Sequence, residues 1–323
     1  MPSLEKPAIV LAPYGSLSLR ALETYESIRA AYEREFPGSQ VLLAFTSQLM
    51  IKRLQEKEGI TVASPQAALE ELNLAGYRRA VVQSLQIVPG EEFHQLAALV
   101  HDLKSHGTGP DFKHLEIGLP LLSSLEDCQR VSRVLPCLWN GSGWEKGDNA
   151  GERKLQSLQS LSDRDPEKEA VLMVGHGTGH PADSLYSLMA RVLEKDHRNV
   201  FLGTLEGFPG LSEMVAELKG SGARKARMLP FLLVAGGHAE NEIAGAGPGS
   251  WKSMLEREGF EVAVGLSGLG EMESIVSIFL EHTISALVWH EDGIGKIDSR
   301  PGIESNRKIN SGMDFDQQVY RPV

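Results

Sequence analysis

The chain has 323 residues, a length typical of two domains, and 41% of its residues are hydrophobic. Its net charge of −11 argues against nucleic-acid binding, which needs clustered Lys and Arg side chains. No run of about 18 apolar residues is present, so we expect no membrane contact. The polar N-terminal residues lack a signal-peptide core, and the two cysteines match no metal spacing, so we expect a reduced, cytoplasmic protein.

Hydrophobic runs alternate with helical patterns over the first 118 residues. Helices are expected at 18–36, around 50–54, from 64 and after 90, and strands at 8–13, 41–45, 80–88 and 115–118. Ser64 should cap a helix that Pro65 opens. This alternation of strands and helices is typical of an α/β fold with a parallel sheet.

The second half of the chain repeats the pattern of the first. Residues 171–178 match 9–16, with His176 in the place of Tyr14, and residues 226–238 match 80–92. Two copies of one unit predict two similar domains whose strand ends can face each other across a cleft. We expect an N-terminal half at 1–135, a polar linker at 136–168, a C-terminal half at 169–285 and a loose tail at 286–323.

Three ligand-type residues follow strands of the second unit: His176, Glu206 and His238. Ligands bind beyond the carboxyl ends of strands in open α/β sheets, so the three side chains can converge on one rim. Two imidazoles and a carboxylate suit Co²⁺, Ni²⁺, Fe²⁺ or Zn²⁺ rather than Mg²⁺ or Ca²⁺. The first unit has Tyr14, Phe45 and Glu92 at the matching places. We therefore expect the second unit to bind the metal and the first unit to shape the cleft.

Each of these residues also has a purely structural interpretation. His176 could be a turn histidine, Glu206 a turn acid and His238 an ordinary residue at a helix start. Their equivalent positions in the repeat favour the metal site over three coincidences. Asp183 stands at a helix start and is expected to be a cap rather than a ligand. No Walker loop, dinucleotide fingerprint or nucleophile elbow is present, so no ATP or redox cofactor is expected.

Several segments together resemble the anaerobic (class II) sirohydrochlorin cobaltochelatase family, whose members insert Co²⁺ into sirohydrochlorin in cobalamin biosynthesis. They are residues 44–47, 88–94, 175–178, 205–207 and 233–242, and the similarity extends from about residue 8 to residue 282. The resemblance implies two flavodoxin-like halves around a tetrapyrrole cleft. It also implies that His176 and His238 bind the metal and accept pyrrole protons, while Glu206 completes the metal site.

The resemblance extends to the substrate side of the cleft. The loop Tyr14-Gly15-Ser16 should face the macrocycle, although it differs from the family's usual Phe-Gly-Thr-Ser type, and Glu92 is a further expected substrate contact. Some exported members carry haem on a histidine in the position of His94. Because an export signal is missing here, the plainer interpretation of His94 is a partly exposed residue in the first turn of a helix.

The expected reaction needs only sirohydrochlorin and a divalent metal ion, and it is compatible with a monomer or a homo-oligomer. Because the ligand set does not separate Co²⁺ from Fe²⁺ or Ni²⁺, a ferrochelatase or a nickel chelatase on the same fold remains an alternative. A second alternative is a tetrapyrrole or metal carrier without catalytic activity.

Overall fold

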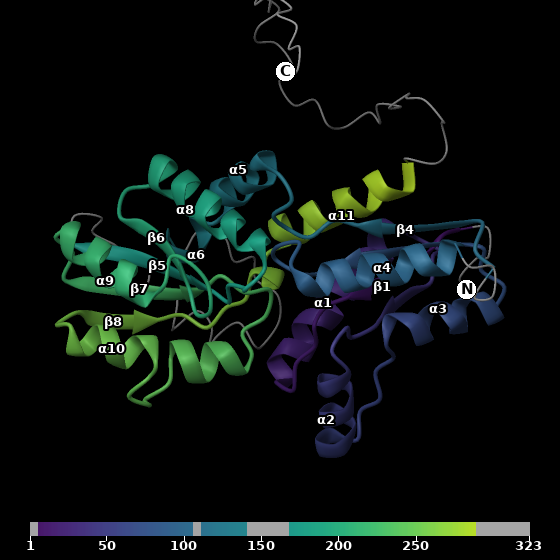
Figure 1. Cartoon of the computed structure of the whole chain (residues 1–323), viewed down its shortest axis with the longest axis horizontal. Helices are drawn as coiled ribbons and strands as arrows, with labels where there is room; N and C mark the ends of the chain where they lie inside the picture. Colours follow the sequence, from purple (N-terminus) through teal and green to yellow (C-terminus); the bar gives the residue numbers. More distant parts are fainter. Residues whose placement is uncertain (1–5, 106–110, 141–167, 289–323) are drawn as a thin grey trace, which may run out of the picture.

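A computed structural model of the chain describes residues 6–105, 111–140 and 168–288 (Figure 1). These residues form two four-stranded parallel sheets, each flanked by helices. The strand orders are β2-β1-β3-β4 and β6-β5-β7-β8, so the two sheets have equivalent topology. The predicted class, two similar parallel α/β units, is confirmed.

The first sheet is built around β1, a strand whose five residues are all buried. Its strands are β1 (Ala8–Ala12), β2 (Val41–Leu43), β3 (Arg79–Ser84) and β4 (His114–Gly118). The helices of this part of the chain are α1 (Leu19–Glu35), α2 (Gln48–Glu58), α3 (Pro65–Leu74), α4 (Glu91–Ser105), α5 (Leu125–Val134) and α6 (Cys137–Asn140). Ser64 caps α3 as predicted, because its side chain accepts a hydrogen bond from the Ala67 amide at 3.2 Å.

The second sheet is built around β5, which is likewise buried along its whole length. Its strands are β5 (Glu169–Gly175), β6 (Val200–Thr204), β7 (Lys225–Pro230) and β8 (Glu261–Val264). The helical segments are η1 (Pro181–Asp183), α8 (Ser184–Asp196), α9 (Leu211–Gly220), η2 (His238–Ile243), α10 (Trp251–Arg257), η3 (Leu269–Glu271) and α11 (Glu273–Val288). The segment η2 is a π-helical turn, a form often found at functional sites.

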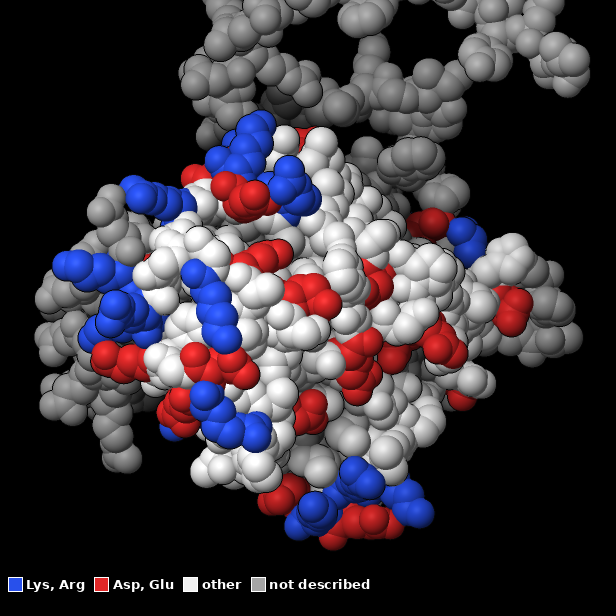
Figure 2. All heavy atoms as spheres, turned by 60° about the vertical axis from the view of Figure 1, so that its left-hand side comes forward, with Lys and Arg blue, Asp and Glu red and all other residues white. Residues whose placement is uncertain are grey.

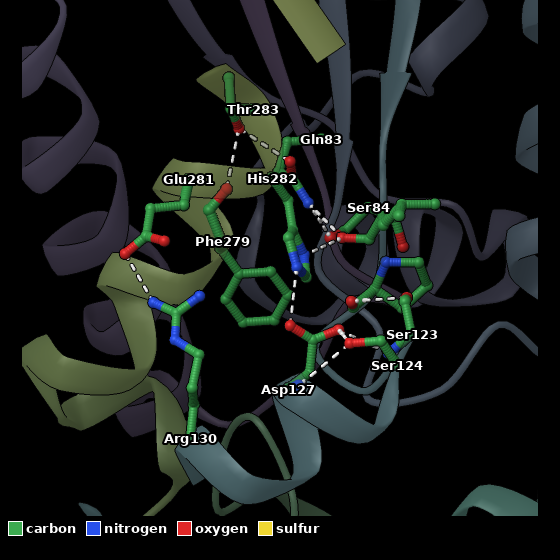
Figure 3. Close-up of polar contacts among 12 residues, drawn as sticks. Gln83, Ser84, Ser123, Ser124, Asp127, Arg130, Phe279, Glu281, His282 and Thr283 are labelled. Carbon is green, nitrogen blue, oxygen red and sulfur yellow. Dashed lines mark hydrogen bonds and ion pairs between the residues drawn. The ribbon is translucent and has the colours of Figure 1, made fainter. Parts of the chain in front are cut away.

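Two helices cross between the halves. The helix α11 follows the second sheet in the chain but packs against β3 and β4 of the first, and α5 packs against α8 (Figure 1). Figure 3 shows the polar contacts at this crossing, where His282 of α11 faces Asp127 of α5. One apolar cluster accordingly includes Ile28 and Leu121 of the first half together with Met189 of the second.

The edges of the predicted segments differ in detail from the sequence expectation. The strand β3 ends at Ser84, not at residue 88, because its neighbour β1 ends at the paired residue Ala12. Residues 137–140, at the start of the expected linker, form α6, in which Leu138 and Trp139 are buried. The helix α11 continues to Val288, beyond the expected start of the tail at 286. The rest of the linker and of the tail lies outside the described residues.

Among the described residues, no helix has the length and apolar character that a membrane span requires. The cytoplasmic location stays a prediction.

Candidate active site

His176 is the first residue after β5, and two glycines flank it. A Cβ on Gly175 would lie 2.6 Å from the ring of Tyr186, and one on Gly177 would lie 2.5 Å from the amide nitrogen of Gly207. Gly177 also has a φ of +79°, which favours glycine. The two glycines therefore serve packing within the protein.

The imidazole of His176 is oriented by its own loop. Its Nδ1 lies 2.9 Å from the carbonyl oxygen of Gly177. A carbonyl oxygen can only accept, so Nδ1 carries the proton and Nε2 keeps its lone pair. The side chain is 38% exposed, so Nε2 is available to an incoming ion or proton.

Glu206 is brought beside His176 by the pairing of β5 and β6. Beyond the end of β6, the Leu205 amide donates to the carbonyl of Gly175, and the Glu206 amide donates to that of His176. The carboxylate oxygen Oε2 of Glu206 lies 3.8 Å from Nδ1 of His176, and the side chain is 61% exposed. The predicted neighbourhood of these two residues is present in the structure.

His238 opens the π-helical turn η2 and faces His176. The two rings have centroids 4.6 Å apart and are nearly perpendicular, at 87°. Two imidazoles that share one ion have ring centres about 4.5–5.2 Å apart, given metal–nitrogen distances of about 2.1 Å. The spacing of the two rings therefore suits a common metal ion.

Glu242, to which the sequence pattern assigned no role, fixes the orientation of His238. Its Oε1 accepts a hydrogen bond from Nδ1 of His238 at 2.8 Å. The Nε2 atom of His238 is thereby left with its lone pair, as in His176. The signal available in the sequence was the i, i+4 spacing of the two residues within the segment 238–242.

The three predicted ligands are neighbours but do not form a closed set. In the part of the chain that the structure describes, no group of three or more His, Cys, Asp or Glu side chains is already arranged to hold a metal ion. The carboxylate of Glu206 faces the Nδ1 side of His176. The Glu206 side chain is 61% exposed, and exposed side chains change rotamer readily, so this orientation of the carboxylate is not fixed by burial.

The predicted substrate contacts of the first half lie near the same place. The hydroxyl oxygen of Ser16 would be 2.9 Å from a Cβ on Gly236, two residues before His238. Gly15 has a φ of +109°, and Tyr14 beside it is 45% exposed. The loop after β1 therefore approaches the segment that carries His238.

Glu92 and His94, at the start of α4, lie beside the loop after β5. A Cβ on Gly90 would be within 4 Å of both the Glu92 carboxylate and the Thr178 hydroxyl. His94 is exposed, as its plainer interpretation requires, and its ring centroid lies 4.7 Å from that of His180. Haem binding at His94 stays untested.

The chain as a whole is acidic. Figure 2 shows acidic side chains spread over the middle of one face, with Lys and Arg side chains gathered mainly toward its margins. The net charge of −11 favours the approach of cations to the protein in general. Behind the site, burial raises the pKa of the Tyr186 phenol, so this ring stays neutral.

Comparisons with known proteins identify the family. A sequence model described as cobalt chelatase (CbiK) matches residues 7–288. The chain belongs to this family. The sirohydrochlorin cobaltochelatase CbiKC of Nitratidesulfovibrio vulgaris is 32% identical over 284 residues, which cover 88% of this chain and 92% of the relative. The sirohydrochlorin cobaltochelatase of Salmonella typhimurium is 29% identical over 286 residues, covering 87% and 97% of the two chains.

Solved structures share the fold of this family member. SirB from Bacillus subtilis with Fe³⁺ has a TM-score of 0.56 at 14% identity. The sirohydrochlorin chelatase SirB from Bacillus subtilis subspecies spizizenii, in complex with cobalt, has a TM-score of 0.52 at 12% identity. Each match covers 88% of this chain and 97% of the other. The predicted family and fold are confirmed, whereas the roles of the individual site residues stay predictions.

Proposed function

We propose that this protein is a sirohydrochlorin cobaltochelatase, which inserts Co²⁺ into sirohydrochlorin and releases two protons. The observation that carries the proposal is the pair of perpendicular imidazoles of His176 and His238. Each ring has its Nδ1 committed to a hydrogen-bond acceptor, so both present a bare Nε2. Membership of the cobalt chelatase family and the cobaltochelatase names of its relatives support the choice of reaction.

Metal insertion needs a group that holds the ion and a group that accepts the pyrrole protons, and a neutral imidazole can do either. The two histidines differ in their partners. Nδ1 of His238 is hydrogen-bonded directly to the Glu242 carboxylate at 2.8 Å, whereas Nδ1 of His176 bonds to a carbonyl and lies 3.8 Å from the Glu206 carboxylate, so a proton on His238 would have the closer counter-charge. We therefore assign proton acceptance mainly to His238, and delivery of Co²⁺ mainly to His176 with Glu206.

The macrocycle is proposed to lie between the carboxyl ends of the two sheets. Tyr14, Gly15 and Ser16 would contact it from the loop after β1, and Glu92 from the start of α4. The exposed ring of Tyr14 offers an apolar surface to a flat ligand, and the nearness of Ser16 to Gly236 supports this placement. Tight positioning of the ring relative to Nε2 would supply much of the rate enhancement.

The deciding experiment is a spectroscopic assay of purified protein with sirohydrochlorin and Co²⁺, Fe²⁺ or Ni²⁺ in turn. We expect the fastest insertion with Co²⁺. Faster insertion of Fe²⁺ or Ni²⁺ would assign the protein to a different metal. Wild-type protein that binds sirohydrochlorin but never exceeds the uncatalysed rate would identify a carrier instead.

His176→Ala tests the proposed site within the same assay. The variant should lose at least about 100-fold in kcat, as expected when a general base or metal ligand is removed. His101→Ala is the matched control, because His101 is an exposed histidine on α4, and it should keep wild-type activity. Full activity in His176→Ala would refute the role given to His176.

A further inference from the structure

Asp183 lies between the two loops that carry His176 and Glu206. Its Oδ1 accepts a hydrogen bond from the Thr178 amide at 3.0 Å, and its Oδ2 accepts one from the Phe208 amide at 2.8 Å. Thr178 is two residues after His176, and Phe208 is two residues after Glu206. One carboxylate therefore joins equivalent points of the two ligand-bearing loops.

The carboxylate fits into a space that only glycine leaves open. A Cβ on Gly207 would lie 2.1 Å from Oδ1 of Asp183, and one on Gly177 would lie 2.5 Å from the Gly207 amide nitrogen. The backbone of the loop after β5 thus contacts the backbone of the loop after β6, and the side chain of Asp183 packs against this contact. An amide donor bonded to a carboxylate forms a charge-assisted hydrogen bond, which is stronger than a neutral one.

The sequence predicted Asp183 as a helix cap: it does stand at the N-cap position of α8, but its side chain does not do the capping. Both carboxylate oxygens are bonded to amides of the loops. The side chain therefore serves the loops and not the helix.

We propose that Asp183 is a positioning residue that holds the two loops close together, so that the side chains of His176 and Glu206 can both reach one Co²⁺ ion. The inference rests on the proposed function for the identity of the metal. At their bases the loops are joined by two backbone hydrogen bonds, from the Leu205 amide to the Gly175 carbonyl at 3.0 Å and from the Glu206 amide to the His176 carbonyl at 2.8 Å. Without the carboxylate, the loop segments around Thr178 and Phe208 would be free to move apart, because the backbone hydrogen bonds hold the loops together only at their bases.

Asp183→Asn is the first test. The amide side chain can accept one of the two backbone hydrogen bonds but presents a donor to the other, so the link is broken on one side. We expect the Kd for Co²⁺, measured without tetrapyrrole, and the KM for Co²⁺ to rise about 10–100-fold. The KM for sirohydrochlorin should stay within about twofold, and the absorption spectrum of bound Co²⁺ should change.

Asp196→Asn is the matched control. Asp196 lies at the other end of α8, where its carboxylate accepts a hydrogen bond from Ser132 at 2.8 Å. This variant should bind Co²⁺ as the wild type does, even if its Tm falls. Wild-type Kd and an unchanged Co²⁺ spectrum in Asp183→Asn would overturn the proposal, as would an equal loss of Co²⁺ affinity in Asp196→Asn.

Gly207→Ala gives an independent test that leaves Asp183 in place. The new Cβ would collide with the carboxylate and displace it, and Gly207 does not have the left-handed φ that would forbid alanine. We expect the same loss of Co²⁺ affinity as in Asp183→Asn. In an Asp183→Ala background the collision with the carboxylate is absent. There, Gly207→Ala should raise the Kd for Co²⁺ by less than about twofold. Additive losses would contradict the proposed link.

These outcomes are separable from a failure of the proposed function. If the wild type binds Co²⁺ but does not metallate sirohydrochlorin, the chelatase assignment fails. The Co²⁺ affinities of the variants still support or refute the role of Asp183 in that case, because they are measured with the metal alone.

Discussion

At the scale of single residues, Glu242 is the contact that most distinguishes the two histidines of the site. Glu242→Gln keeps an oxygen that can accept from Nδ1 of His238 but removes the negative charge. We expect kcat to fall about 10–100-fold with little change in the KM for sirohydrochlorin. Steady-state assays at several Co²⁺ and sirohydrochlorin concentrations would separate the two parameters.

Glu240→Gln is the control for this change, because Glu240 is an exposed acid in the same π-helical turn. It alters the local charge equally but leaves the His238 contact in place. A similar fall in kcat in both variants would mean that general electrostatics, and not the contact with His238, explains the effect.

Gly175 shows how closely the site depends on packing behind it. In Gly175→Ala the added Cβ would lie 2.6 Å from the buried ring of Tyr186. We expect a loss of about 1–3 kcal/mol in the free energy of unfolding, because the core must shift to accept the methyl group. Urea unfolding measures this loss of stability. Gly179→Ala is the control, because a Cβ on Gly179 would have no neighbouring atom within 4 Å. Equal stabilities of the two variants would refute this explanation.

The sequence located His176, Glu206 and His238 well, because the positions of strand ends follow from hydrophobic periodicity and from the internal repeat. It did not reveal the task of Asp183. That task depends on the backbone of two loops meeting in space, and a residue before a helix is normally expected to cap it. Nor did the sequence show why glycine stands at positions 175 and 177, where a Cβ would meet Tyr186 and Gly207.

At the scale of elements, a largely buried hydrogen bond between His282 and Asp127 lies where α5 and α11 cross. Nε2 of His282 lies 3.2 Å from Oδ1 of Asp127, and both side chains are nearly inaccessible to solvent. Burial by itself would raise the pKa of Asp127, but hydrogen bonds from His282 and Ser124 outweigh it and lower this pKa below its ordinary value. The carboxylate therefore stabilises the fold when it is ionised.

The lowered pKa of Asp127 sets the direction of a pH effect. Its contribution is fully present above the ordinary aspartate pKa of about 4 and is lost as the pH falls through the lowered value. Asp127→Asn should cost about 1.5–3 kcal/mol at pH 7, because it removes hydrogen bonds to a charged group. Its penalty should shrink as the pH falls below about 4.

Urea unfolding of wild type and variant between pH 7 and pH 3 measures this penalty. Glu126→Gln is the control, because Glu126 is the exposed acid next to Asp127 on α5. A penalty for Asp127→Asn that is the same at every pH would show that packing, and not the ionised carboxylate, is what the substitution removes.

Strands and helices were largely predictable as elements, but their partners were not. The apolar positions of α11 show that the helix is buried on one side. They do not say which sheet it covers, and the chain order suggests the second sheet rather than the first. The choice is made by contacts such as those of Thr283, which exist only once both halves have folded.

At the scale of the whole molecule, the crossing helices should make the two halves unfold together. Thr283 of α11 donates a hydrogen bond to Oε1 of Gln83 in β3 at 2.7 Å, and the Tyr32 hydroxyl of α1 lies 3.0 Å from the same Thr283 oxygen. All three side chains are buried. Buried hydrogen bonds thus connect the second half of the chain to the core of the first.

Thr283→Val keeps the shape of the side chain but leaves the Tyr32 and Gln83 groups without their partner. Buried polar groups that lose a partner cost about 1–3 kcal/mol. Because the halves share α5, α11 and one apolar cluster, we expect a single transition that moves to lower urea concentration, with the same midpoint by tryptophan fluorescence and by circular dichroism. Ser277→Ala, which removes a hydroxyl bonded only within α11, should leave that midpoint nearly unchanged. Two separate transitions in Thr283→Val would mean that the halves unfold independently and that the contacts of the crossing helices do not couple their stabilities.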